Sequence, residues 1–167
     1  LVLNTVRELP AAERYLRAGD WAQAPYRLTA SLRNKTMGIL GLGRIGKAIA
    51  KRGEAFGLKI AYCGRNKQPD VAYPFFESPR ALALACDILV IAAPGGAQTR
   101  HIVDAQVLQA LGPSGFLINI ARGSLVDEAA LIAALHAGSI AGAGLDVFAQ
   151  EPHFNQAFLS VPNAVLL

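Results

Sequence analysis

The sequence has only two cysteines, Cys63 and Cys86, and these are too few for a disulfide framework. Their spacing does not match that of a metal site, so we expect no bound metal. Such a low cysteine content is typical of a reduced, cytoplasmic protein. No apolar run approaches the length needed to cross a bilayer, because alanine and glycine interrupt the most apolar stretch, CDILVIAAPGGA at residues 86–97. We therefore expect no membrane partner.

The chain also lacks any segment in which positive or negative charges are concentrated. The formal net charge is +4, and the lysines and arginines are scattered, which argues against a nucleic-acid partner. The pattern of a signal peptide is also missing. The chain opens without Met in a helix-like stretch and ends at residues 163–167, NAVLL, which are typical of the start of a strand. We expect it to be a piece of a longer polypeptide.

The length of 167 residues and the 53% hydrophobic content suit one principal core. Near the start, apolar side chains recur at roughly helical spacing: Leu3, Val6, Leu9 and Leu16. Gly19 is a plausible end of this helix, and Pro10 within it predicts a kink or two short helices. We therefore predict a connecting helix and linker at residues 1–30, followed by a nucleotide-binding domain at residues 31–167.

From residue 36 onward, short apolar runs alternate with helical patterns. The expected strands are residues 36–40, 58–63, 87–93, 115–121, 140–147 and 163–167. Three of the intervening helices have N-terminal caps, which are Ser78, Asp104 and Asp127. Pro79 follows Ser78 at the first helical position, and the helix that begins after Asp127 ends at Gly138. This alternation predicts an α/β fold, a doubly wound parallel sheet of the Rossmann type.

A glycine-rich turn follows the first of these strands and opens a helix. Gly41, Gly43 and Gly46 form the pattern G-x-G-x-x-G. In that context the first glycine permits the tight turn, the second lets the backbone approach a pyrophosphate, and the third lets the helix pack on the strand. The free N–H groups of the helix would face the phosphates. The alternative is a packing turn that binds no ligand.

The stretch AYCGRNK, residues 61–67, runs across the end of the second expected strand and contains no acidic residue. An Asp or Glu at this place hydrogen-bonds the ribose 2′-hydroxyl of NAD, whereas an arginine accommodates the 2′-phosphate of NADP. Arg65 and Lys67 lie where that acid would be expected. They predict NADP as the cofactor, with NAD less favoured; the alternative is a solvated surface cluster.

Three longer segments, GILGLGRIGKAIAKR, LINIARGSLVDEAAL and AGAGLDVFAQEPH, resemble the nucleotide-binding domain of the D-isomer-specific 2-hydroxyacid dehydrogenases. YCGRNK, KQPDVAYPFF and QALGPSGFLINIARG are similar to the NADPH-dependent hydroxypyruvate/glyoxylate reductases and hydroxyphenylpyruvate reductases of that family. The resemblance covers almost the whole chain. It implies one part of a two-domain enzyme that reduces small 2-oxo acids, with the substrate domain outside this chain.

The resemblance also implies roles for single residues. Arg122 matches the arginine that binds the substrate carboxylate and polarises the keto group, and Glu151 matches the acid that pairs with the catalytic histidine. The remaining matches are to cofactor contacts: Arg44 and Ile45 over the pyrophosphate, Pro94 and Thr99 near the phosphates, Ile120 and Ala121 in the nicotinamide pocket, and Asp146 near the carboxamide.

Two departures from the family pattern stand out. Pro94 is followed by Gly95 and Gly96 instead of Leu-Thr, which predicts a looser loop and a lost cofactor contact. The catalytic histidine of the family follows the final strand in a Pro-His pair, and the only Pro-His pair in these 167 residues, Pro152-His153, precedes that strand. His153 is not its counterpart by position, because it directly follows Glu151-Pro152.

The leading hypothesis is therefore the cofactor domain of a 2-oxo acid reductase. A nucleotide-sensing regulatory module of the corepressor type is the second hypothesis, and another Rossmann enzyme, similar to homocysteine hydrolase or alanine dehydrogenase, is a third with a poorer motif match. The sequence is compatible with hydroxypyruvate, glyoxylate and bulkier 2-oxo acids as substrates. The resemblance also implies a homodimer, in which Leu3, Val6 and Leu9 form a contact face; the alternative is an intrachain core helix.

Overall fold

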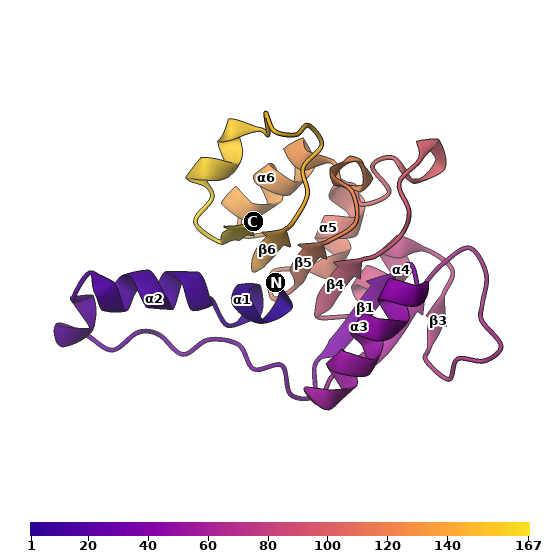
Figure 1. The fold of residues 1–167 in the computed structure, drawn as a ribbon, viewed down its shortest axis with the longest axis horizontal. Coiled ribbons are helices and arrows are strands. Elements are labelled where there is room, and N and C mark those ends of the chain that lie inside the picture. Colours follow the sequence, from indigo (N-terminus) through magenta and orange to yellow (C-terminus); the bar gives the residue numbers. More distant parts are fainter.

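A computed structural model describes all residues, 1–167, and its centre is a seven-stranded sheet (Figure 1). The strands are β1 Thr36–Leu40, β2 Lys59–Cys63, β3 Phe75–Phe76, β4 Ile88–Ile91, β5 Phe116–Asn119, β6 Gly142–Leu145 and β7 Ala164–Leu166. All six pairings are parallel, in the order β3-β2-β1-β4-β5-β6-β7. The chain winds outward from β1 in one direction and from β4 in the other, which confirms the doubly wound fold.

Helices connect the strands as the sequence predicts. They are α3 Arg44–Ala55, α4 Pro79–Leu84, α5 Ala105–Leu111 and α6 Glu128–His136, with short 3-10 helices η2 Ala97–Thr99, η3 Gly123–Leu125 and η4 Gln156–Ser160. The side chains of Ser78, Asp104 and Asp127 each accept a hydrogen bond from a backbone N–H of the first turn, so the three predicted caps are confirmed. Gly138 has a φ of 65° directly after the end of α6, as a terminating glycine requires.

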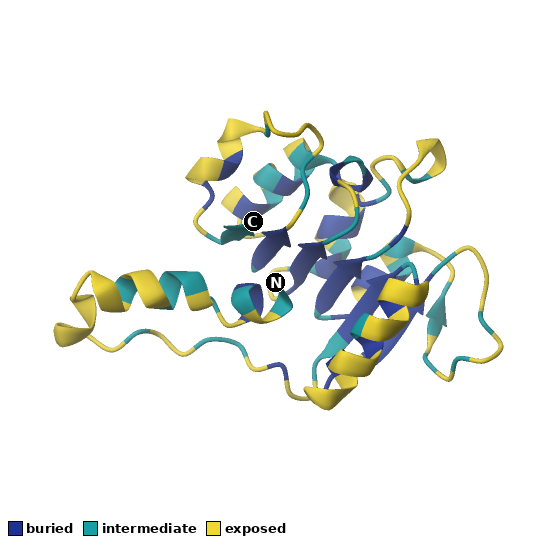
Figure 2. Ribbon diagram, viewed as in Figure 1, coloured by how far each residue is buried: buried dark blue, intermediate teal, exposed yellow.

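Successive strand residues point to opposite faces of the sheet, and helices cover both faces, so both sets of side chains are buried. Leu89 and Ile91 of β4 belong to a core of 23 buried residues with α4, α5 and α6, whereas Ile88 and Val90 belong to a second core of 13 with α1 and α3. Figure 2 shows these central strands as the most buried part of the molecule. The continuous apolar run in this part of the sequence is therefore a doubly covered parallel strand, as predicted.

The first helical stretch is broken in two, which confirms the effect predicted for Pro10. Helix α1 spans Val2–Val6 and α2 spans Leu9–Arg17, and Glu8 between them has a left-handed backbone with a φ of 51°. Val6 is 1% exposed and belongs to the second core. The alternative of an intrachain core residue is therefore correct for Val6, and it does not lie on an exposed contact face with Leu9.

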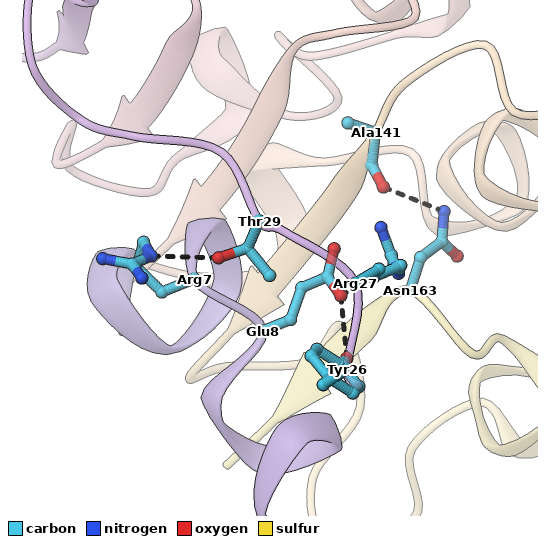
Figure 3. A network of polar contacts seen from close by, with 7 residues as sticks. All are labelled: Arg7, Glu8, Tyr26, Arg27, Thr29, Ala141 and Asn163. Atoms are coloured by element: carbon cyan, nitrogen blue, oxygen red, sulfur yellow. Dashed lines mark hydrogen bonds and ion pairs between the residues drawn. The ribbon is translucent and has the colours of Figure 1, made fainter. Parts of the chain in front are cut away.

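Residues 7–30, which we call the arm, extend away from the sheet and return (Figure 1). The arm contains α2, which has no buried residue, and the 3-10 helix η1 Asp20–Ala22. Figure 3 shows that side chains near its base join its two branches: Arg7 Nε donates to Thr29 Oγ1 at 3.0 Å, and the Glu8 carboxylate accepts from Tyr26 Oη at 2.9 Å and pairs with Arg27 at 2.7 Å. Asn163, beside β7, donates to the Ala141 carbonyl.

The arm is thus organised mainly by its own contacts, whereas α1 packs against the sheet. The division between residues 1–30 and 31–167 remains a prediction. None of the helices combines the length and the apolar character that a membrane span requires.

Candidate cofactor and active site

A cleft of about 790 Å³ opens at the carboxyl ends of β1, β2 and β4. The winding direction of the sheet reverses between β1 and β4, and ligands of doubly wound sheets bind at that point. The walls of the cleft are residues 40–43 at the start of the glycine turn, the segment after β2 and the loop after β4. Among the predicted cofactor residues, the cleft is lined by Gly41, Gly43, Arg65, Pro94 and Thr99.

The three glycines of the turn have different surroundings. Gly41 has a φ of 97°, and a Cβ added there would lie 2.6 Å from the Ala93 backbone. A Cβ on Gly46 would lie 2.3 Å from the Gly41 carbonyl oxygen, so packing requires glycine at both positions, and the positive φ favours it at Gly41 as well. A Cβ on Gly43 would meet nothing within 4 Å. The backbone at Gly43 is therefore open to a ligand in the cleft.

Helix α3 begins directly after Gly43, and no side chain caps its first turn. The first N–H groups of a helix lack partners within it, and the positive end of its dipole favours an anion. Arg44 and Ile45 occupy this turn but do not line the cleft itself, and Ile45 is 62% exposed. The end of α3 thus offers the donors and the charge that a pyrophosphate needs.

The segment after β2 brings cationic and neutral polar groups to the cleft. Arg65 lines it, whereas Lys67 is exposed outside the lining. Asn66 and Gln68 also line it, although neither belongs to a motif that could be recognised in the sequence. The nearest following acid, Asp70, pairs with Lys47 of α3 at 3.0 Å, and this partner lowers the pKa of the Asp70 carboxyl. Cys63, at the base of the cleft, has its thiol pKa raised by burial.

The loop after β4 forms the facing wall. The hydroxyl of Thr99 lies 3.0 Å from the Pro94 carbonyl oxygen and donates to it, so the two ends of the loop are joined. A Cβ added to Gly95 would lie 3.0 Å from Cγ of Arg122. Gly95 therefore allows the aliphatic part of Arg122 to approach this loop, a contact that the sequence did not reveal.

Arg122 follows β5, and a buried asparagine shapes its loop. Asn119 is 1% exposed; its amide nitrogen donates to the Arg122 carbonyl at 3.0 Å, and its amide oxygen accepts from the Ala121 N–H at 3.1 Å. The Arg122 guanidinium is exposed and donates to the Ala121 carbonyl. The sequence signal for Asn119 was available, since a polar residue inside a buried strand needs partners.

Glu151 lies beyond β6, in a segment that contacts the Arg122 loop. A Cβ added to Gly123 would lie 1.9 Å from the Phe148 carbonyl carbon, so the two backbones are in direct contact. Glu151 accepts from the Phe148 N–H at 2.8 Å, and Glu128 of α6 accepts from the Ala149 N–H at 2.7 Å. Glu128 thus holds the segment that carries Glu151.

The other predicted nicotinamide-side residues lie outside the cleft lining. Asp146 is exposed directly after β6, and its N–H donates to the Asn119 carbonyl at 3.0 Å. Ile120 packs against the core on the α1 and α3 side of the sheet, and Ala121 packs against the core on the other side. Together with Arg122 they follow the ends of neighbouring strands β5 and β6, at the same edge of the sheet as the cleft.

Comparison with known proteins shows to which protein family the chain is related. Residues 1–167 match the family described as D-isomer specific 2-hydroxyacid dehydrogenase, NAD binding domain. The chain belongs to this family. Its sequence resemblance and the predicted Rossmann fold are thereby confirmed.

Individual members of the 2-hydroxyacid dehydrogenase family are closely similar to this chain in sequence. The chain is 52% identical to glyoxylate/hydroxypyruvate reductase A HPR2 of Arabidopsis thaliana over all of its own length and 53% of the relative. It is 48% identical to 2-ketogluconate reductase of Gluconobacter oxydans over 99% of its length and 54% of the relative. The chain thus spans about half the length of these relatives.

A solved structure of a family member has the same fold. The NADPH-dependent glyoxylate/hydroxypyruvate reductase of Sinorhizobium meliloti, in complex with NADP and malonate, superposes with a TM-score of 0.94 at 51% identity. The match covers 99% of this chain and 53% of that one.

Proposed function

We propose that the chain is the cofactor-binding part of a cytoplasmic, NADPH-dependent reductase that converts glyoxylate, hydroxypyruvate or similar 2-oxo acids to D-2-hydroxy acids. The observation that carries this proposal is the cleft at the switch point of the sheet, which Arg65 lines and to which residues 61–67 contribute no carboxylate. The NADP-bound relative of Sinorhizobium meliloti supports it.

The residues of the cleft fit a dinucleotide with a 2′-phosphate. The open backbone at Gly43 and the uncapped start of α3 would receive the pyrophosphate, under Arg44 and Ile45 and close to Pro94 and Thr99. Arg65, with Lys67 nearby, would bind the 2′-phosphate. The nicotinamide would lie toward the ends of β5 and β6, where Ile120, Ala121 and Asp146 are found. A bound reduced nicotinamide supplies the hydride.

Arg122 is proposed to bind and orient the substrate. Its exposed planar guanidinium matches a 2-oxo acid, since it can contact the carboxylate and stabilise the charge that develops on the keto oxygen. Glu151 is proposed to steady a histidine outside these 167 residues that gives the proton. In the structure the Glu151 carboxylate is exposed and within reach of solvent, bound only to the Phe148 N–H.

A regulatory module of the corepressor type is the alternative function. The relatives named above are reductases, which favours catalysis. A turnover assay on the full-length protein separates the two functions, because a sensor would bind NADPH with no steady reduction of 2-oxo acids.

The test of the cofactor assignment is Arg65→Ala in the full-length protein. A charge-assisted hydrogen bond contributes about 1.5–3 kcal/mol, so NADPH affinity should fall about ten- to a hundredfold. NADH affinity should stay nearly constant, because NADH has no 2′-phosphate. Calorimetric titration of both cofactors measures the change, with Arg52→Ala in the last turn of α3 as a matched control. Equal weakening of both cofactors, or an original preference for NADH, would contradict the assignment.

We also propose that the full-length protein is a homodimer and that the arm contacts the second copy. Four large apolar side chains of the arm are exposed: Leu9 by 47%, Leu16 by 57%, Trp21 by 64% and Leu28 by 99%. Replacing Leu16 and Trp21 by Asp should shift the protein to a monomer in sedimentation velocity, with the sheet still folded by circular dichroism. A wild-type monomer at high concentration would refute the dimer.

A further inference from the structure

The two candidate 2′-phosphate ligands, Arg65 and Lys67, lie in residues 64–70, which we call the cation loop. Gln68 directly follows Lys67 in this loop. The side-chain amide of Gln68 donates to the Leu42 carbonyl at 2.7 Å, across the cleft edge, in the middle of the glycine turn. Its backbone N–H donates to the hydroxyl of Tyr62 at 2.8 Å. One residue therefore joins the cation loop to the glycine turn and to β2.

Both partners of Gln68 are fixed parts of the fold. Leu42 is 3% exposed between Gly41 and Gly43, and Tyr62 is fully buried in β2. A carbonyl oxygen only accepts hydrogen bonds, so the Gln68 atom that faces Leu42 must be the amide nitrogen. Because both bonds are short and end on rigid groups, they define where the cation loop lies relative to the pyrophosphate site.

The cation loop has little else to hold it. No hydrogen bond of the structure involves residues 64–67, and a Cβ on Gly64 would meet nothing within 4 Å. The one ion pair of the loop joins Asp70 to Lys47, whose side chains are 69% and 43% exposed. Exposed pairs of this kind contribute little and are screened by salt. Gln68 is thus the principal attachment of the loop.

We propose that Gln68 is a positioning residue that sets the preference for NADPH over NADH by holding the cation loop beside the glycine turn. This inference rests on the proposed function, in which Arg65 binds the 2′-phosphate. A loop held in its binding position has less freedom to lose when the phosphate binds. Without Gln68, Arg65 remains present but must be ordered by the ligand itself.

The test replaces Gln68 by Met in the full-length protein, which keeps the length of the side chain and removes its N–H donor. NADPH affinity should fall about three- to tenfold through the lost preorganisation, and NADH affinity should change by less than about twofold. Gln109→Met, on the exposed side of α5, is the matched control and should alter neither affinity. Tyr62→Phe removes the second attachment with a conservative change and should lower the preference in the same direction.

The combination of Gln68→Met with Arg65→Ala decides how Gln68 acts. If Gln68 works through Arg65, its replacement should have almost no effect on NADPH affinity once Arg65 is absent. Additive losses in the double variant, equal weakening of both cofactors, or an unchanged preference in Gln68→Met would each overturn the inference. An Arg65→Ala variant that keeps the NADPH preference would instead refute the proposed function, so the two failures are distinguishable.

Discussion

Gly123→Ala should destabilise the protein by about 3 kcal/mol or more. The added Cβ would lie 1.9 Å from the Phe148 carbonyl carbon and 2.2 Å from the Ala149 nitrogen. These are backbone atoms that cannot rotate away, and Glu128 and Glu151 hold the same segment through its N–H groups. Overpacking typically costs 1–3 kcal/mol, and we expect about 3 kcal/mol or more here because a backbone must move.

Thermal and urea unfolding measure this loss. For a domain of this size, about 3 kcal/mol corresponds to a fall in melting temperature of roughly 6–12 °C. Gly64→Ala is the matched control, because its Cβ would meet nothing within 4 Å and its backbone has no positive φ. A Gly123→Ala protein as stable as wild type would mean that the two loops are not held as closely as the structure places them.

The same substitution also tests the relation between the two candidate catalytic residues. Arg122 and Gly123 are consecutive, and the segment that they contact leads directly to Glu151. Separation of the two loops would displace Arg122 from Glu151 and leave the glycine turn in place. We therefore expect kcat/KM for the 2-oxo acid to fall in a Gly123→Ala protein that still binds NADPH with nearly unchanged affinity.

Most of the fold could be predicted from the sequence because its signals are local. The caps Ser78, Asp104 and Asp127, the glycine turn and the apolar run of β4 each act within a few residues of their own position. Strand β3, Phe75–Phe76, was not predicted. It has only two residues and exists through its pairing with Tyr62 and Cys63 of β2, so no local pattern marks it.

The candidate site was predictable only where a residue belongs to a recognisable motif. The glycines and Arg65 could be found in this way, whereas Gln68 could not, because its bond to Leu42 crosses 26 residues. The contact between Gly95 and Arg122 likewise joins two loops that are distant in sequence. Val6 shows the same limit, since helical spacing alone does not distinguish a residue facing the sheet from one facing a partner.

The 167-residue chain alone is expected to bind NADPH and to reduce glyoxylate or hydroxypyruvate at a rate near background. Binding should persist because the cleft, the start of α3 and the cation loop all lie within the chain. Turnover should be lost, because the chain corresponds to only 53% of the length of its relative from Arabidopsis thaliana. Nothing within it matches the second domain that would exclude water and position the substrate over Arg122.

The proton that reduction requires is the second reason for the expected inactivity. Of the three histidines, His136 lies in the last turn of α6, 3.4 Å from Ser160, and His101 and His153 are exposed on loops. None follows the last strand, where the family resemblance places the proton donor. Loss of a positioned general acid typically lowers the rate about 10²–10⁴-fold, and loss of substrate positioning adds to this.

Stopped-flow and steady-state assays of the chain and the full-length protein, both saturated with NADPH, provide the comparison. Equal NADPH affinity of the two proteins is the necessary control, since it shows that the isolated chain is folded around the cleft. Turnover by the chain within tenfold of the full-length rate would contradict the assignment of the proton donor. If His153→Ala then abolished that turnover, His153 would be the donor, and Glu151, two residues before it, would act on a group within its own loop.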